Sequence, residues 1–209
     1  MKEQVLESPF CKKEFLELVD IVSEVKTTKL KNYGISDSSI VNIGDRDFVD
    51  YRPDISIEPQ VLKDNNISSI SFDSLHFFQV QNLVEEIDTK SVKIKKSDVA
   101  VNLILPRTYE EYLESLTKKN RHELRRKKRK FDNETTSYEL GESKEQDIFD
   151  IFISQHRESK GEKGEFMTEV VETYFRNLLN LQGWKIYYTN TDKGVLSTAF
   201  CYENDDGCY

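Results

Sequence analysis

The chain has 209 residues, 37% of them hydrophobic, and a formal net charge of −8 at pH 7. This apolar content can build the core of one large domain or of two small ones. No run of about 18 apolar residues occurs, and the first residues lack the continuous apolar stretch of a secretory signal. We therefore expect a cytoplasmic globular protein without a membrane-spanning helix.

Residues 1–105 are predicted to form an α/β region of their own. Apolar residues recur with helical spacing at Phe15, Leu18, Val19 and Val22. An alternation of strands and helices favours a layered α/β fold over a helix bundle. The expected elements are a helix in 10–24, a strand in 38–43, a helix in 57–65, a strand in 67–72, a helix in 77–87 and a strand within 91–105.

The stretch 106–132 has the most one-sided charge in the chain. Between residues 118 and 130, nine Lys or Arg residues accompany one acid, Glu123, so this segment carries +8 and the remainder of the chain carries −16. Apolar residues recur at three-, four- and seven-residue spacing, which predicts one long amphipathic helix with its basic residues turned outward. Thr108 is placed to cap the N-terminus of this helix.

Three interpretations of the basic helix are open. Charge runs on helices are most often solvated faces. Alternatively, the helix is a cradle for an anionic substrate or cofactor, or it binds the phosphates of a nucleic acid. The net charge of −8 argues against indiscriminate nucleic-acid binding. A local basic stripe can still act alone, because screening limits electrostatic reach to about 10 Å at moderate salt.

The last third of the chain is predicted to contain a strand, two helices and a β-hairpin. Gly183 follows the second helix, where glycine commonly stands. Trp184, Tyr187 and Tyr188 are expected on a central strand, and alternation along that strand leaves one tyrosine hydroxyl free to face a cleft. The expected elements are a strand in 135–140, a helix in 145–158, a GEKGEF loop at 161–166, a helix in 167–181, and strands in 184–189 and 195–202 joined by an NTDKG turn.

The sequence around the basic helix is similar to that of an enzyme family. A strand ends in Leu-Pro, and then come Glu-Glu-Tyr, a leucine pair, Lys-Asn-Arg and Leu-Arg-Arg-Lys-x-Arg-Lys. This pattern resembles the BioF2-like or CelD-like branch of the GCN5-related N-acetyltransferases (GNAT), relatives of the FemAB peptidoglycan aminoacyltransferases. The Asp50-Tyr51 pair extends the resemblance weakly. The matching residues are Leu105, Pro106, Glu110, Glu111, Tyr112, Leu113, Leu116, Lys119, Asn120, Arg121, Leu124, Arg125, Arg126, Arg129 and Lys130.

The resemblance covers most of residues 95–209 and implies a function. A protein of this family would move an acyl group from acetyl-CoA or another acyl-CoA to an amine, which would be a small molecule or a cell-envelope precursor. The FemAB relatives imply an alternative in which aminoacyl-tRNA is the donor. The rival from another class is a non-enzymatic nucleic-acid-binding protein that uses the basic helix.

The resemblance also implies an incomplete domain. The order strand, helix, helix, strand, strand begins the GNAT-like mixed sheet, and a further strand and helix N-terminus of the family hold the cofactor. The chain has no glycine-rich phosphate-binding loop. It ends at Tyr209, where the resemblance places the start of the cofactor-binding strand. We therefore expect an N-terminal α/β region (1–105), the basic helix (106–132) and an incomplete acetyltransferase-like unit (133–209), a fragment that is inactive alone.

The resemblance suggests substrate-binding residues in two places. His156 and Arg157 end a predicted helix at the stretch that lines the acceptor side in the family. Arg121 and Arg125 lie on the basic helix. The alternative for the first pair is that both residues only cap the last helical turn, where cations are stabilised.

Acyl transfer also needs a base, which in this family is often a carboxylate acting through water. The carboxylates nearest the expected cleft are Glu165, Glu203, Asp205 and Asp206, although ordinary exposed acids are the alternative for each.

Histidine and cysteine positions exclude other chemistries. The histidines form no triad and no H-E-x-x-H motif, which argues against a hydrolase and a zinc enzyme. The cysteines show no metal-ligand spacing, and we expect them to be reduced thiols. These residues are His76, His122 and His156, and Cys11, Cys201 and Cys208.

Overall fold

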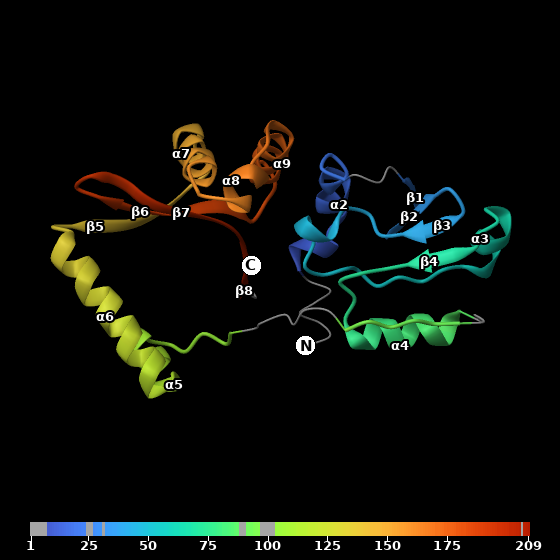
Figure 1. Cartoon of the computed structure of the whole chain (residues 1–209), viewed down its shortest axis with the longest axis horizontal. Coiled ribbons are helices and arrows are strands. Elements are labelled where there is room, and N and C mark those ends of the chain that lie inside the picture. Colours follow the sequence, from blue (N-terminus) through green and yellow to red (C-terminus); the bar gives the residue numbers. More distant parts are fainter. Residues whose placement is uncertain (1–7, 24–26, 31, 88–90, 97–102, 206) are drawn as a thin grey trace.

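The computed structural model describes residues 8–23, 27–30, 32–87, 91–96, 103–205 and 207–209. These residues form an α/β protein with two four-stranded sheets, one in each half of the chain (Figure 1). The predicted α/β class is confirmed.

The N-terminal sheet has the strand order β1-β2-β3-β4. Its first two pairings are antiparallel and the β3–β4 pairing is parallel. Tyr33, Ile40 and Leu83 lie in the core of this half, and Leu83 comes from α4, which packs below the sheet (Figure 1). The elements are η1 (Pro9–Cys11), α2 (Lys13–Val19), β1 (Thr28–Leu30), β2 (Tyr33–Ser36), β3 (Ser39–Val41), η2 (Arg46–Phe48), α3 (Pro59–Asp64), β4 (Ser69–Ser71) and α4 (Phe77–Glu86).

A buried arginine organises the loops around this sheet. The Arg52 side chain is only 2% exposed, and it donates hydrogen bonds to the carbonyls of Ile43 (2.6 Å) and Gly44 (2.9 Å). Its Nη2 also lies 2.7 Å from Asp73 Oδ1. Burial lowers the pKa of Arg52, but the guanidinium stays charged and satisfies three acceptors at once.

The C-terminal sheet is antiparallel throughout, in the order β5-β6-β7-β8. Helices α7, α8 and α9 lie on one side of this sheet, and α5 and α6 lie on the other side (Figure 1). The elements are α5 (Tyr109–Ser115), α6 (Lys118–Glu134), β5 (Tyr138–Ser143), α7 (Gln146–Arg157), α8 (Glu162–Phe166), α9 (Glu169–Leu179), β6 (Trp184–Thr191), β7 (Gly194–Asn204) and β8 (Gly207–Cys208).

The two halves of the chain share one apolar core. Phe15 and Val19 of α2 are buried in the same cluster as Tyr174 and Leu178 of α9 and Trp184 of β6. Helix α2 therefore belongs by sequence to the N-terminal region and by packing to the C-terminal sheet as well.

The prediction of one long helix over 106–132 is wrong, because two helices occupy this stretch. Helix α5 ends at Ser115, and the next residue, Leu116, has an extended backbone (φ −79°, ψ 152°). The Thr117 side chain then accepts a hydrogen bond from the Asn120 N–H at 3.3 Å. Thr117 thus starts a new helix with its own cap. The predicted cap at Thr108 is confirmed, since its hydroxyl accepts from the Glu111 N–H at 3.2 Å.

The prediction of a loop at 161–166 is also wrong, since Glu162–Phe166 form α8. Gly161 adopts a left-handed backbone (φ 70°) directly before the helix, and Glu162 and Glu165 lie in its first turn, where acids are favoured. Gly164 allows this turn to approach α7, because a Cβ there would lie 2.3 Å from the Ser159 carbonyl oxygen.

Other boundaries differ from the predictions in detail. The described parts of 91–105 contain no strand, and the Ile104 side chain is 91% exposed; residues 97–102 lie outside the described ranges. The strand predicted at 135–140 is displaced to Tyr138–Ser143. The helix predicted in 10–24 is confirmed but shorter, because a 3-10 turn beginning at Pro9 precedes it. The hairpin of β6 and β7 is confirmed, with β6 as a central strand.

Candidate functional site

A hollow of about 440 Å³ opens beside the C-terminal half of α7. Helix α7 contributes residues at helical spacing, which places them on one side of the helix. Glu172 of α9 closes the other wall. The lining residues are Asp150, Ile153, Ser154, Arg157, Glu158 and Glu172.

Carboxylates outnumber cations around this hollow. Arg157 Nη2 lies 2.7 Å from Glu172 Oε2, and Arg176 Nη2 lies 2.9 Å from Glu172 Oε1. The hydrogen bonds from Arg176 and Arg157 lower the pKa of Glu172, which therefore stays ionised. Glu158 accepts a hydrogen bond from the Ser154 hydroxyl at 2.8 Å and forms no ion pair with a described residue. The hollow thus offers negative charge to a cationic ligand.

The two predicted residues at the end of α7 have different surroundings. Arg157 lines the hollow and also donates to the Met167 carbonyl at 3.1 Å, so it fastens α7 to the start of α9. His156 packs edge-to-face on Phe152, with ring centroids 5.1 Å apart. Its Nδ1 is shielded from solvent and has no hydrogen-bond partner among the described residues.

The other two predicted residues lie on α6, on the opposite side of the sheet from α7 (Figure 1). Arg121 Nη2 donates to the Leu116 carbonyl at 3.1 Å, which ties it to the break between α5 and α6. Arg125 is exposed. The structure therefore does not bring Arg121 and Arg125 together with His156 and Arg157.

A second polar group lies on the sheet face away from α7 and α9. Lys185 and Tyr187 share this face because alternate strand residues point the same way. Lys185 Nζ lies 2.8 Å from Glu142 Oε2 and 2.9 Å from Glu203 Oε2, and the Tyr187 hydroxyl donates to Glu203. We call these four residues the open-face cluster. Sequence reasoning named Glu203 as a candidate base and one of Tyr187 and Tyr188 as facing a cleft, but it missed Lys185 and Glu142, although the alternation of Lys185 and Tyr187 was a signal.

The pKa shifts of Glu203 and Tyr187 make the open-face cluster poorly suited to proton transfer. The hydrogen bonds from Tyr187 and Lys185 lower the pKa of Glu203, so this predicted base stays ionised and accepts protons weakly. The bond to Glu203 raises the pKa of Tyr187 to about 12, so its hydroxyl keeps its proton at neutral pH. The cluster therefore suits binding and orientation.

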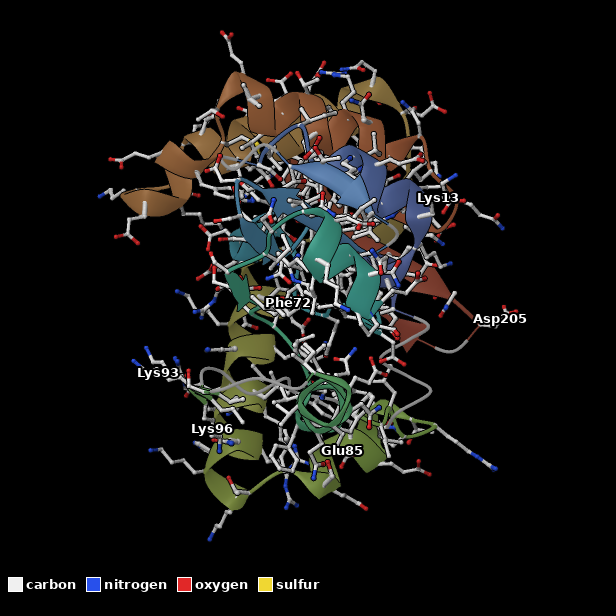
Figure 2. All side chains as sticks on the ribbon, turned by 90° about the vertical axis from the view of Figure 1, so that its right-hand side faces the viewer. Lys13, Phe72, Glu85, Lys93, Lys96 and Asp205 are labelled. Atoms are coloured by element: carbon white, nitrogen blue, oxygen red, sulfur yellow. The ribbon has the colours of Figure 1, made fainter. Side chains whose placement is uncertain are left out.

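The remaining predicted carboxylates lie apart from both groups. Glu165 is exposed on α8. Asp205 projects outward from the turn between β7 and β8 (Figure 2). Residue 206 lies outside the described residues.

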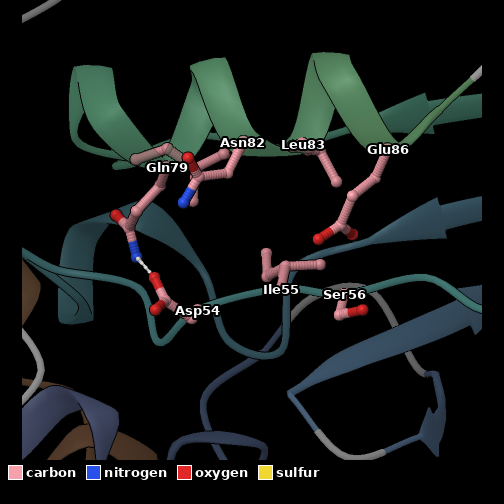
Figure 3. Close-up of a pocket in the computed structure, with 8 residues that line it drawn as sticks. Asp54, Ile55, Ser56, Gln79, Asn82, Leu83 and Glu86 are labelled. Carbon is pink, nitrogen blue, oxygen red and sulfur yellow. Dashed lines mark hydrogen bonds between the residues drawn. The ribbon is translucent and has the colours of Figure 1, made fainter.

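A second hollow, of about 220 Å³, lies between α4 and residues 54–56 (Figure 3). Gln79 Nε2 donates to Asp54 Oδ1 at 3.1 Å and to the Arg52 carbonyl at 2.8 Å, so Gln79 mainly holds the loop against the helix. Glu86 lies at the other end of the hollow. No residue of this hollow was predicted from the sequence.

Among the described residues, no group of three or more His, Cys, Asp or Glu side chains is arranged to hold a metal ion. The described helices are all too short or too polar to cross a membrane. Comparison with family models, with curated proteins and with solved structures yields no match.

Proposed function

We propose that this chain is part of an N-acyltransferase that moves an acyl group from acyl-CoA to an amine. The observation that carries the proposal is the order of elements in the C-terminal half. A strand, helices on one face and an antiparallel strand pair follow each other as the resemblance implies. The short helix α8 and the two-residue strand β8 are additions to that order.

The hollow beside α7 is the proposed acceptor site. An amine reaches it as an ammonium ion, which Glu158 attracts by charge, with a smaller share from Asp150 because Arg176 Nη2 lies 3.8 Å from Asp150 Oδ1. Glu158 is the residue we assign to orienting the amine, because its only described partner is the Ser154 hydroxyl. Arg157 holds the wall in place through Glu172 and the Met167 carbonyl, and it is a positioning residue in this proposal.

The reaction itself would follow ordinary acyl transfer. The ammonium loses a proton to water or a carboxylate, and the free amine attacks the thioester carbonyl carbon. The attacking nitrogen loses a second proton, the C–S bond breaks, and the leaving thiolate takes up a proton to give the free thiol and the amide. Acyl-CoA acts as co-substrate here. The residues of this chain bind and orient the amine, and we assign no residue to the pyrophosphate.

Calorimetric titration with acetyl-CoA, on this chain and on the complete gene product, tests the proposal. A panel of primary amines is then incubated with acetyl-CoA, and the acylated product is identified by mass spectrometry. We expect acylation by the complete gene product and at least a tenfold lower kcat/KM in Glu158→Gln. The matched control Glu162→Gln, on the exposed start of α8, should keep full activity. No binding and no acylation by the complete gene product would overturn the proposal.

A further inference from the structure

The nine Lys and Arg residues of α6 differ in whether an acid of the same helix neutralises them. Three of them pair with acids on the same helix, at Arg126–Glu123 (2.8 Å), Lys128–Asp132 (2.9 Å) and Lys130–Glu134 (3.8 Å). Lys118, Arg125 and Arg129 form no ion pair with a described residue, and all three are exposed. The pairing therefore leaves a defined subset of the charge unneutralised.

Three of the unpaired cations lie in a line along the helix, whereas Lys119, Arg121 and Lys127 lie off this line. Lys118, His122, Arg125 and Arg129 are spaced by four, three and four residues, so they lie on one side of α6. We call them the α6 stripe. At about 1.5 Å rise per residue, the stripe extends about 16 Å. The apolar Leu124 and half-buried Phe131 point elsewhere on the helix.

The stripe is turned away from the body of the protein. Phe131 fixes the opposite side of α6 by packing edge-to-face on Tyr138, with ring centroids 5.1 Å apart. No residue of α6 is buried, so the helix stands away from the sheet (Figure 1). The stripe is thus accessible along its whole length.

We propose that the α6 stripe binds the phosphate backbone of a nucleic-acid duplex without reading its sequence. A duplex presents about one negative charge per 1.7 Å of its axis, so Lys118, Arg125 and Arg129, spread over about 16 Å, can each meet a phosphate. The major groove of DNA admits an α-helix. The rest of the chain carries −16, and its repulsion would restrict contact to α6. This inference does not depend on the proposed acyltransferase activity.

Two other polyanions fit the stripe less well. Helices that bind anionic membranes insert apolar side chains beside their cations, whereas Leu124 and Phe131 lie away from the stripe. Proteins that bind single strands stack bases on aromatic side chains, and the stripe contains only the imidazole of His122.

The test uses fluorescence anisotropy with a labelled duplex DNA of about 20 base pairs, a length that exceeds the stripe. The stripe variant carries Lys118→Gln, Arg125→Gln and Arg129→Gln. The matched control carries Arg126→Gln, Lys128→Gln and Lys130→Gln, which removes the same charge from the same helix. Circular dichroism confirms that both variants keep their helices.

We expect the stripe variant to lose at least tenfold in affinity at low salt, and the control to lose less than threefold. The log–log slope of affinity against salt should fall by about 3 in the stripe variant, because each lost phosphate contact removes about 0.9. Equal losses in both variants would overturn the inference, as would absence of binding at low salt. Tighter binding to single-stranded RNA or to anionic vesicles than to the duplex would also overturn it.

Discussion

Phe15 stacks on Trp184, with ring centroids 6.1 Å apart and ring planes within 16° of parallel. The pair joins α2, near the start of the chain, to β6 of the C-terminal sheet. Both side chains are almost fully buried, at 1% and 7% exposure. The contact makes the stability of each half depend on the other.

Phe15→Ala should lower the free energy of unfolding by about 3–5 kcal/mol, because it leaves a cavity beside Trp184. Trp184 is the single tryptophan, so its fluorescence during denaturant unfolding reports the C-terminal half directly. Phe77→Ala is the control, since Phe77 is 71% exposed and should change stability little. An unchanged Trp184 transition in Phe15→Ala would contradict the shared core.

Arg52→Met should cost about 3 kcal/mol, because the carbonyls of Ile43 and Gly44 lose their donors inside the protein. Arg52→Lys keeps the charge but not the planar fork, and it should also destabilise the protein. Asp73→Asn should cost less, since that carboxylate is 44% exposed. Urea unfolding of the three variants measures this order, and a tolerated Arg52→Lys would show that charge alone matters.

The open-face cluster should make stability depend on pH at both ends of the range. The pKa of Glu203 is lowered, so its contribution is complete above the ordinary value of about 4.3 and is lost as the pH falls through the lowered value. The pKa of Tyr187 is raised to about 12, so its contribution is complete below the ordinary value of about 10 and is lost as the pH rises towards 12.

The Tm of Tyr187→Phe, measured against pH, distinguishes the alkaline contribution of Tyr187 from the acidic contribution of Glu203. The difference in Tm from the unsubstituted protein should be constant at neutral pH and should shrink above about pH 10, where the wild-type hydroxyl begins to lose its advantage. Tyr138→Phe, at a half-exposed position outside the cluster, is the control. Parallel curves for the unsubstituted protein and Tyr187→Phe at alkaline pH would show that the bond to Glu203 adds nothing.

Gly164→Ala should destabilise the junction of α7 and α8 by about 1–3 kcal/mol, because the new methyl group meets the backbone of Ser159 and not a movable side chain. Gly207→Ala is the matched control, since its Cβ would approach Tyr209 no closer than 4.0 Å. Thermal unfolding compares the two variants. A neutral Gly164→Ala would mean that α8 can move away from α7 without loss.

Periodicity predicted the helices that bury one side. Phe149, Phe152 and Ile153 of α7 and Leu83 of α4 recur at helical spacing, and both helices lie where expected. The break at Leu116 was not predictable in this way, because Leu116 continues the apolar pattern. The start of a separate helix after Leu116 depends on the Thr117 hydroxyl, which caps α6 at a point where the predicted longer helix would have continued.

The sites were less predictable than the elements, because their geometry depends on strand register and on long-range packing. The open-face cluster exists only because Tyr187 pairs with Glu142 of β5 and Lys185 with Cys201 of β7. Arg157 was predicted from its place at the end of a helix. Its partner Glu172 comes from another helix, and no local pattern indicates that contact.

The packing of α2 on α9 and β6 also has a consequence during protein synthesis. Helix α2 ends at Val19, whereas Trp184, which completes its core, is added much later. At about 5–20 residues per second, the ribosome needs on the order of 10–30 s to extend the chain from one to the other. Throughout that interval the apolar side of α2 has no native partner from β6. The nascent chain therefore exposes an apolar surface that chaperones have time to bind.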